Sequence, residues 1–160
     1  MKVLVAILED LGVRKVKTYI QSGNAVFVIP GKDASQLSNR IGCEVKKRCG
    51  FEPHVLLLES EDIERAISRN PFPDAATEPK ALHVGFLAFK PEQPNLERLK
   101  SFKSASERFH VIDKVFYLHA PEGIGRSKLA ANAERLLGVP MTDRNWRTVT
   151  TLWKMAQDLE

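Results

Sequence analysis

The spacing of apolar residues changes between a helical and a strand period several times along the chain, and this alternation limits the folds it can adopt. Residues 3–11 carry apolar side chains at helical spacing, whereas residues 13–21 alternate in the manner of a half-buried strand. Further strands are predicted at 25–29, 54–59, 82–89, 109–113 and 115–119. Further helices are predicted at 34–48, 95–104, 127–137 and 143–159, with one more beginning at Ser60. Short elements joined by short turns indicate an α+β protein.

The order of these elements predicts two similar halves. The first half is αββαβ followed by a helix, and the second is βαββα followed by the final helix. One additional strand in front of residue 3 would make the first half a βαββαβ unit, the ferredoxin-like split βαβ arrangement. We therefore expect two tandem ferredoxin-like α/β plaits, at residues 1–73 and 74–160, with a C-terminal helix. The first plait lacks its N-terminal strand, and the two are expected to form one compact unit.

Positive charge is concentrated in the second half of the chain. The 160 residues carry a formal net charge of +4, with a sequence pI of about 9.1. Residues 98–154 contain eleven Lys or Arg against five acidic residues, whereas residues 1–80 contain twelve against eleven. Such an excess favours an anionic partner, although a modest bias of this kind also serves solubility.

Composition also bears on the cellular setting. Cys43 and Cys49 lie on a predicted helix and point about 240° apart around its axis, so we expect two free thiols in a reducing cytoplasm. No second cysteine pair completes a zinc site, and neither a metal nor a cofactor is expected. No apolar run approaches the roughly 20 residues that span a bilayer, so we expect a cytoplasmic protein without a membrane partner.

Four stretches of the sequence resemble a known family. They are TYIQSGNAVF at 18–27, NPFP at 70–73, YLHAPEGIGRSKLA at 117–130 and ERLLGVPMTDRNWRTVTTLWKMA at 134–156. In this order, and over essentially the whole chain, they closely resemble the bacterial family called domain of unknown function 1697. The resemblance implies a ferredoxin-like α/β architecture and a cytosolic bacterial protein. It brings no established activity, cofactor or catalytic residue.

The start of the chain departs from the pattern of that family. Its members usually begin with a strand and a loop resembling ALLRGINVGG, and here Met1 stands where the following helix begins. We therefore expect the chain to be truncated or to start from a late methionine, which would leave strand edges exposed. Neighbouring strands could close the gap, or another chain could fill it, so self-association through an open sheet edge is one expected partnership.

The first candidate site is the stretch PEGIGRSK. Gly123 and Gly125 would relieve crowding where backbone N–H groups turn toward an anion, and a helix beginning at Ser127 would add partial positive charge. Arg126 and Lys128 would supply direct contacts. The spacing fits neither G-x-x-x-x-G-K-[ST] nor G-x-G-x-x-G. Two interpretations stay open, a phosphate-binding site and a strand-to-helix turn with Ser127 as its N-cap.

The second candidate is the stretch TDRNWRTV. Thr142 or Asp143 is expected to cap the last helix, so that Arg144, Asn145 and Arg147 gather around its first turn. The planar guanidinium of arginine, with its fork of donors, suits planar anions. The stretch therefore predicts a basic, hydrogen-bonding helix end.

The third candidate is the turn YIQSGN. Tyr19 and Gln21 share one face of the predicted strand, and the turn presents Ser22 and Asn24. Ser22 would be a nucleophile only beside a base, and no G-x-S-x-G elbow is present. A hairpin turn without a chemical role is the alternative.

The histidines suggest structural roles. All four, His54, His83, His110 and His119, fall in predicted strands, and none has the spacing of a chelating pair. His110 and His119 could meet across their predicted hairpin.

These observations favour a non-enzymatic module that binds an anionic ligand. The ligand would be a phosphate-bearing small molecule, or less favourably a nucleic acid, with Arg126, Lys128, Arg144 and Arg147 as its anchors. The aromatic RNA-binding motif of RNA-recognition sheets is missing, which argues against recognition of that kind. An enzyme acting on a small molecule and a protein-interaction scaffold are the alternatives.

Overall fold

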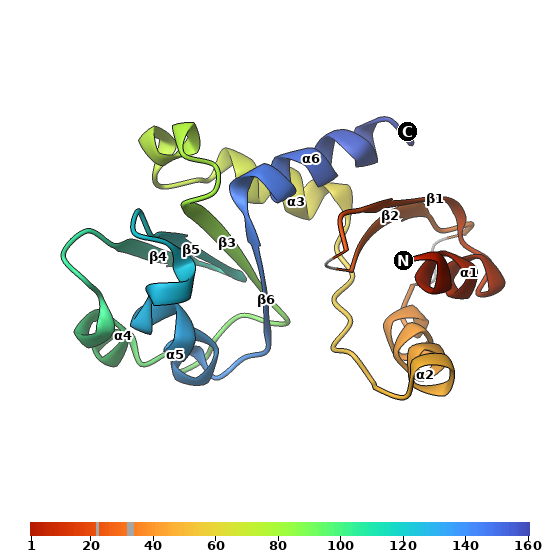
Figure 1. The fold of residues 1–160 in the computed structure, drawn as a ribbon, viewed down its shortest axis with the longest axis horizontal. Coiled ribbons are helices and arrows are strands. Elements are labelled where there is room, and N and C mark those ends of the chain that lie inside the picture. Colours follow the sequence, from red (N-terminus) through yellow and green to blue (C-terminus); the bar gives the residue numbers. More distant parts are fainter. Residues whose placement is uncertain (22, 32–33) are drawn as a thin grey trace. The chain divides into compact units, whose positions relative to one another are not determined.

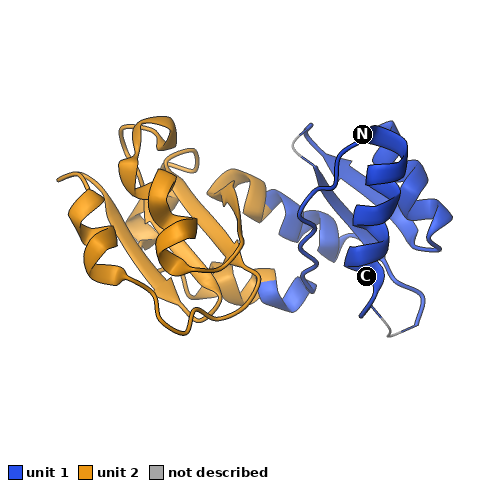
Figure 2. Ribbon diagram, turned by 90° about the horizontal axis from the view of Figure 1, so that it is seen from below, with its two compact units in different colours: residues 1–62, 151–160 blue, residues 63–150 orange. Residues whose placement is uncertain are grey.

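The computed structural model describes residues 1–21, 23–31 and 34–160 (Figure 1). It divides into two compact units, Met1–Asp62 with Thr151–Glu160 and Ile63–Thr150 (Figure 2). The boundary falls inside the helices α3 (Ser60–Ser68) and α6 (Trp146–Gln157), which contribute residues to both units. The predicted α+β class is confirmed, because the described chain forms six α-helices and two antiparallel sheets. The division at residue 73 and the assignment to ferredoxin-like plaits stay predictions.

Unit 1 packs helices against a two-stranded sheet. The strands β1 (Arg14–Tyr19) and β2 (Asn24–Val28) pair in antiparallel fashion. The helices α1 (Lys2–Asp10) and α2 (Leu37–Cys49) supply most of the buried apolar side chains, and the left-handed Gly50 ends α2. The buried core of the unit consists of Ile7, Leu8, Val13, Leu37, Ile41 and Val45.

Two expectations for unit 1 are wrong. Residues 54–59 form no strand in the described part of the chain; Val55 and Leu57 pack against the core, but the segment joins neither sheet. A strand requires a hydrogen-bonded neighbour, and this segment pairs with neither β1 nor β2. The strand predicted at residues 13–21 is too long, because Ile20 lies beyond the end of β1 with a φ of +50° and is 51% exposed.

Unit 2 contains a four-stranded sheet with the order β4-β5-β3-β6. In sequence order its elements are β3 (Leu82–Leu87), α4 (Leu96–Phe102), β4 (Arg108–Ile112), β5 (Val115–His119), α5 (Lys128–Leu137) and β6 (Met141–Asn145). All neighbouring strands are antiparallel. Two short 3₁₀ helices, η1 (Pro73–Thr77) and η2 (Ile124–Arg126), precede β3 and α5 respectively.

The two faces of this sheet are covered by different helices. The helices α4 and α5 lie over one face (Figure 1). On this face Phe116 and Leu118 pack with Leu99 of α4 and Leu129 of α5. Side chains alternate along a strand, so Tyr117 points to the other face. There its hydroxyl donates a hydrogen bond of 2.6 Å to the Ala66 carbonyl in α3.

The last strand of unit 2 corrects the predicted start of the final helix. Thr142 or Asp143 was expected to cap that helix, but both lie inside β6, where they pair with Phe86 and Gly85 respectively. The polar sequence MTDRN lacks the apolar alternation by which a strand is usually recognised. Pairing with the fully buried β3 nevertheless makes it an edge strand.

The structure also corrects the expectations for three of the four histidines. His54 lies in the segment that joins no sheet. His110 pairs with Tyr117, and His119 pairs with Arg108, so the two histidines do not face one another across the β4–β5 hairpin.

Candidate functional site

The start of α5 has the local structure that one interpretation of PEGIGRSK predicts. Gly123 has a φ of +98° and begins the 3₁₀ turn η2, a conformation that glycine adopts without steric cost. The Ser127 hydroxyl then accepts a hydrogen bond of 3.0 Å from the Ala130 N–H. Ser127 is therefore the N-cap of α5, and it satisfies one of the free amides of the first helical turn.

A pocket of about 520 Å³ opens beside this helix start and brings several predicted residues together. We call it the α5-start pocket. Gly123, Arg126, Ser127 and Lys128 line it, whereas Gly125 lines a second pocket. The remaining lining residues are Ser101, Phe102, Ser104, Glu107, Ala120 and Glu122.

A buried carboxylate already lies in the α5-start pocket. Glu107 is only 4% exposed, and its side chain accepts a hydrogen bond of 2.9 Å from the Ser104 N–H. Burial alone would raise the pKa of Glu107, but hydrogen bonds from Ser104 and Ser127 outweigh burial and hold the pKa below its ordinary value. The pocket therefore combines the cations of Arg126 and Lys128 with an ionised carboxylate.

The second pocket, of about 280 Å³, lies between the sheet and α5. We call it the sheet pocket. Its walls are mainly apolar, and Asp143 and Ser127 are its polar side chains. The complete lining consists of Phe116, Leu118, Ile124, Gly125, Ser127, Ala130, Ala131, Met141 and Asp143.

Asp143 is paired with a buried histidine. The Asp143 Oδ2 lies 2.9 Å from the His83 Nδ1, and His83 is only 6% exposed. A carboxylate is an acceptor, so the Nδ1 of His83 carries the proton of this bond. The other ring nitrogen, Nε2, is buried and has no hydrogen-bond partner among the residues that the structure describes.

Of the residues predicted to gather around the start of the last helix, Asn145 and Arg147 lie at the start of α6, whereas Arg144 lies within β6. Arg144 lies in β6 opposite Val84, one position from Asp143, so its side chain leaves from the opposite sheet face. Burial lowers the pKa of the Arg144 guanidinium, and its Nη1 donates to the Asp143 carbonyl at 2.8 Å. Asn145 ends β6, and Arg147 lies exposed in the first turn of α6.

The YIQSGN turn belongs to unit 1. Tyr19 and Asn24 are paired across the β1–β2 hairpin, and Asn24 is only 6% exposed. The Asn24 side-chain amide donates a hydrogen bond of 3.2 Å to the Tyr19 carbonyl, which ties the two ends of the turn together. Gln21 is exposed, and Ser22 lies outside the described residues.

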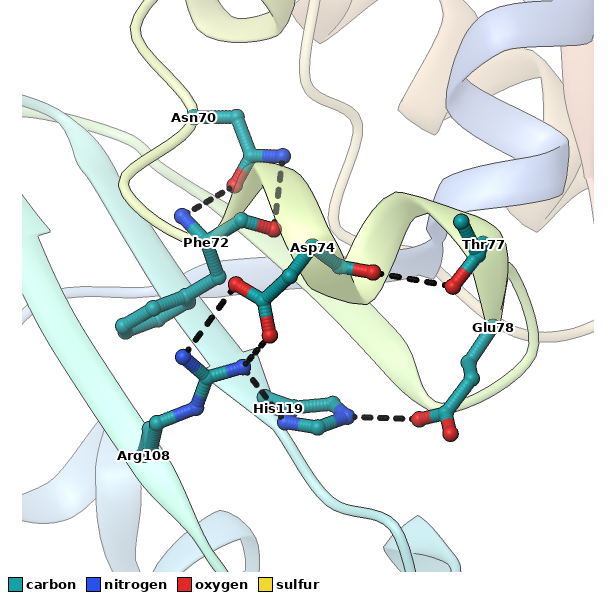
Figure 3. Close-up of polar contacts among 7 residues, drawn as sticks. All are labelled: Asn70, Phe72, Asp74, Thr77, Glu78, Arg108 and His119. Atoms are coloured by element: carbon teal, nitrogen blue, oxygen red, sulfur yellow. Dashed lines mark hydrogen bonds and ion pairs between the residues drawn. The ribbon is translucent and has the colours of Figure 1, made fainter.

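A further polar cluster holds η1 against the sheet of unit 2 (Figure 3). Arg108 of β4 contacts both carboxylate oxygens of Asp74, at 3.3 and 2.8 Å, and its guanidinium lies 4.7 Å from the centre of the Phe72 ring. Asn70 bonds both the N–H and the carbonyl of Phe72. The NPFP stretch thus shapes the turn that brings Asp74 to Arg108.

The same cluster fixes the proton on His119. A guanidinium has only donors, so the contact of 3.1 Å between the Arg108 Nη2 and the His119 Nδ1 makes Nδ1 an acceptor. The proton is then on Nε2, which donates to the Glu78 carboxylate at 2.8 Å. Both ring nitrogens of His119 are therefore paired within this cluster (Figure 3).

Sequence reasoning missed Glu107, His83 and Asp143 as site residues. Glu107 precedes β4 and meets the start of α5 through the fold of the sheet. His83 and Asp143 are 60 positions apart, and only the pairing of β3 with β6 brings them together. An apolar strand interrupted by a histidine, as in LHVGFL, is the one signal that the sequence offers for such a site.

Three findings concern metal ions, membranes and cysteines. Within the described ranges, no group of three or more His, Cys, Asp or Glu side chains could hold a metal ion. None of the helices in the described part of the chain is long and apolar enough to cross a membrane. Cys43 and Cys49 are both free and exposed.

The chain was compared with curated proteins, solved structures and protein families. No curated protein matches it. The solved structure of the conserved bacterial protein SP0830 from Streptococcus pneumoniae is similar, with a TM-score of 0.61 and 24% sequence identity over 94% of this chain and 84% of that one. This likeness shows a shared fold. Residues 1–117 match the family described as Protein of unknown function (DUF1697), and the chain therefore belongs to that family.

Proposed function

We propose that the protein binds a small phosphate-bearing molecule in the α5-start pocket, without catalysing a reaction on it. One observation carries the proposal: Gly123, Arg126, Ser127 and Lys128 line a single pocket at the positive end of α5. A volume of about 520 Å³ lies within the range of about 300–1,000 Å³ typical of small-molecule sites. We place this function in the cytoplasm, which suits the two free cysteines.

The charges in the pocket specify the ligand further. Arg126 and Lys128 provide the donors that a phosphate requires, and a guanidinium can bond two phosphate oxygens at once. Glu107 and Glu122 lie in the same lining, and a carboxylate repels a second anion but accepts hydrogen bonds from hydroxyl groups. A ligand with a phosphate at one end and hydroxyl groups at the other fits this arrangement.

Glycerol 3-phosphate and glycerol form a matched pair of probes for this proposal, because they differ by the phosphate. We expect glycerol 3-phosphate to cause saturable shifts of the backbone amide signals of residues 123–128 in an NMR titration, and glycerol to cause none. A hydrogen bond to a charged group contributes about 1.5–3 kcal/mol. The substitutions R126A and K128A should therefore each weaken binding by about tenfold or more.

Arg135 supplies the control. It lies in the last turn of the same helix and is outside the pocket lining, so R135A removes one positive charge without touching the site. The proposal fails if glycerol 3-phosphate does not saturate, or if R135A weakens binding as much as R126A. Duplex DNA is the comparison for a nucleic-acid partner. Its binding would fall with salt by a log–log slope near −0.9 per phosphate neutralised, and a DNA complex without glycerol 3-phosphate binding would replace the proposal.

A further inference from the structure

We propose that the sheet pocket is a second ligand site, which takes a small aromatic amine and pairs its ammonium group with the Asp143 carboxylate. Asp143 is one of the residues that line this pocket, and its side chain is 29% exposed. Its Oδ2 is held by the His83 Nδ1 at 2.9 Å, whereas its Oδ1 accepts no hydrogen bond from the residues that the structure describes. The carboxylate is therefore fixed in place and still has an oxygen to offer to a ligand.

The charge of Asp143 has no arginine or lysine to pair with. In the described part of the chain its ion-pair partner is His83, which carries a charge only when it is protonated. The exposed Asp74, by contrast, pairs with Arg108 at 2.8 Å. Arg144 follows Asp143 in the sequence, but its Nη1 donates to the Asp143 backbone carbonyl. A partly buried carboxylate is stabilised by a cation beside it, and an ammonium group of a ligand would supply that cation.

The strand register places this carboxylate and an aromatic ring on one sheet face. Phe116, Gly85 and Asp143 form a row across β5, β3 and β6, on the face that packs against α5. Adjacent strands lie about 4.8 Å apart, so the backbones of Phe116 and Asp143 are about 10 Å apart. Both residues line the sheet pocket. A single small molecule in the pocket can therefore contact the ring with one end and the carboxylate with the other.

Met141 forms another wall of the pocket beside this row. It lies two positions before Asp143 in β6, so its side chain leaves from the same sheet face. A Cβ built at Gly85 would lie 2.5 Å from the Met141 sulfur, which shows that the Met141 side chain extends over the glycine. A flexible thioether is a wall that adapts to rings of different shape.

The lining determines the class of ligand. The walls around Asp143 are mainly apolar and include Leu118, Ile124 and Ala130, so they favour a hydrocarbon ring. An apolar cavity of about 150 Å³ holds one benzene molecule. The sheet pocket, at about 280 Å³, has room for a ring with a short arm. A charge among such walls is costly unless it is paired, so the charged end of the arm must lie at Asp143 and must be positive.

Benzylamine and benzyl alcohol test the inference on the full chain, because they share a ring and a one-carbon arm and differ in charge at neutral pH. We expect benzylamine to bind about tenfold more tightly, since a hydrogen bond between charged groups is stronger than a neutral one. NMR titration of the amide signals of residues 129–131 and 141–143 measures both affinities. In the unaltered protein, the resonance of the Asp143 carboxyl carbon should move when benzylamine binds.

Three variants sharpen the test. D143N removes the charge and keeps an oxygen that can accept from His83, so the preference for benzylamine should disappear while benzyl alcohol still binds. D113N is its matched control, because Asp113 is exposed in the β4–β5 turn and does not line the pocket, and the preference should persist. A130L fills the pocket from a helix position that tolerates leucine, so both probes should lose binding.

The inference is wrong if the two probes bind equally to the unaltered protein, or if neither of them saturates. It is also wrong if D143N keeps the preference, if D113N loses it, or if the Asp143 carboxyl resonance does not respond to benzylamine. Binding of glycerol 3-phosphate reports separately on the α5-start pocket. Since Asp143 does not line that pocket, D143N should leave glycerol 3-phosphate binding unchanged, and the two proposals can fail independently.

Discussion

At the scale of single residues, Asn145 determines where the last helix begins. Its Oδ1 accepts a hydrogen bond of 2.9 Å from the Thr148 N–H, the geometry of an N-cap. Replacing it by alanine leaves an amide of the first turn unpaired, so we expect N145A to lower the free energy of unfolding by about 1 kcal/mol. Urea denaturation measures the change.

Two further substitutions test this cap. N145D keeps a capping oxygen, and we expect it to retain most of the stability. T142A removes a hydroxyl inside β6 and leaves the cap intact, so its effect should be smaller than that of N145A. A larger loss in T142A than in N145A would contradict the observed start of α6.

Tyr117 links a buried hydroxyl to the pH dependence of stability. Its side chain is fully buried and bonds the Ala66 carbonyl, and burial raises the pKa of Tyr117 to about 12. An exposed tyrosine has a pKa of about 10. Above roughly pH 10 the unfolded chain therefore loses this proton while the folded chain keeps it, so stability is fully present below pH 10 and falls as the pH rises toward 12.

The variant Y117F isolates this contribution. It leaves the Ala66 carbonyl without its donor, which should cost about 1–3 kcal/mol at neutral pH. Its stability should also decline less between pH 9 and pH 11.5 than that of the unaltered protein, as measured by urea denaturation at each pH. Y19F is the control and should keep the original slope. An equal alkaline slope in Y117F and in the unaltered protein would refute the assignment.

At the scale of elements, one arginine fastens η1 to the sheet. Arg108 bonds Asp74 and the His119 ring and lies over Phe72, so R108A removes three contacts of the same segment (Figure 3). We expect faster hydrogen exchange at the amides of residues 72–78 in R108A, measured by mass spectrometry. R69A, which breaks the exposed ion pair with Asp113, should leave that exchange unchanged. Unchanged exchange at these amides in R108A would show that η1 is held by other contacts.

The elements that the sequence predicts well are those with local signals. Ser127 with its capping hydroxyl and Gly50 with its left-handed backbone mark helix ends that the sequence already indicates. The strand β6 carries no such signal, because pairing with β3 decides its structure and its composition is polar. The strand predicted at residues 54–59 is wrong for the opposite reason. The segment has the apolar pattern of a strand, but the pattern alone cannot supply a neighbouring strand.

The candidate sites likewise divide into those that a local sequence pattern predicts and those that depend on long-range pairing. Gly123, Arg126, Ser127 and Lys128 could be named from the sequence because they are neighbours in it, and a single turn brings them to one pocket. The pairing of His83 with Asp143 depends on the register of β3 and β6, and no local pattern contains that register. Arg144 shows the converse. It lies in the strand β6, whereas Arg147, with which it was predicted to cluster, lies in the first turn of α6.

At the scale of the whole molecule, the two units differ in the size and the burial of their sheets. Unit 2 has four strands, and every residue of its strand β3 is buried. The described residues of unit 1 form two strands, and the strand β1 is exposed or only partly buried throughout. A two-stranded sheet is marginally stable unless helices cover it. The stability of unit 1 therefore depends on the packing of α1 and α2 against its sheet.

This difference predicts two levels of opening in native-state hydrogen exchange. We expect the amides of β3 and β5 to exchange only through global unfolding, and those of β1, β2 and α1 to exchange through a smaller opening with a lower free energy. Exchange measured at rising, sub-denaturing urea concentrations separates the two, because a large opening depends more steeply on urea. The substitution I7A, in the core of unit 1, should then lower the opening free energy of β1 and β2 more than that of β3. Equal opening free energies and equal urea dependence in both sheets would instead mean that the chain unfolds as a single cooperative unit.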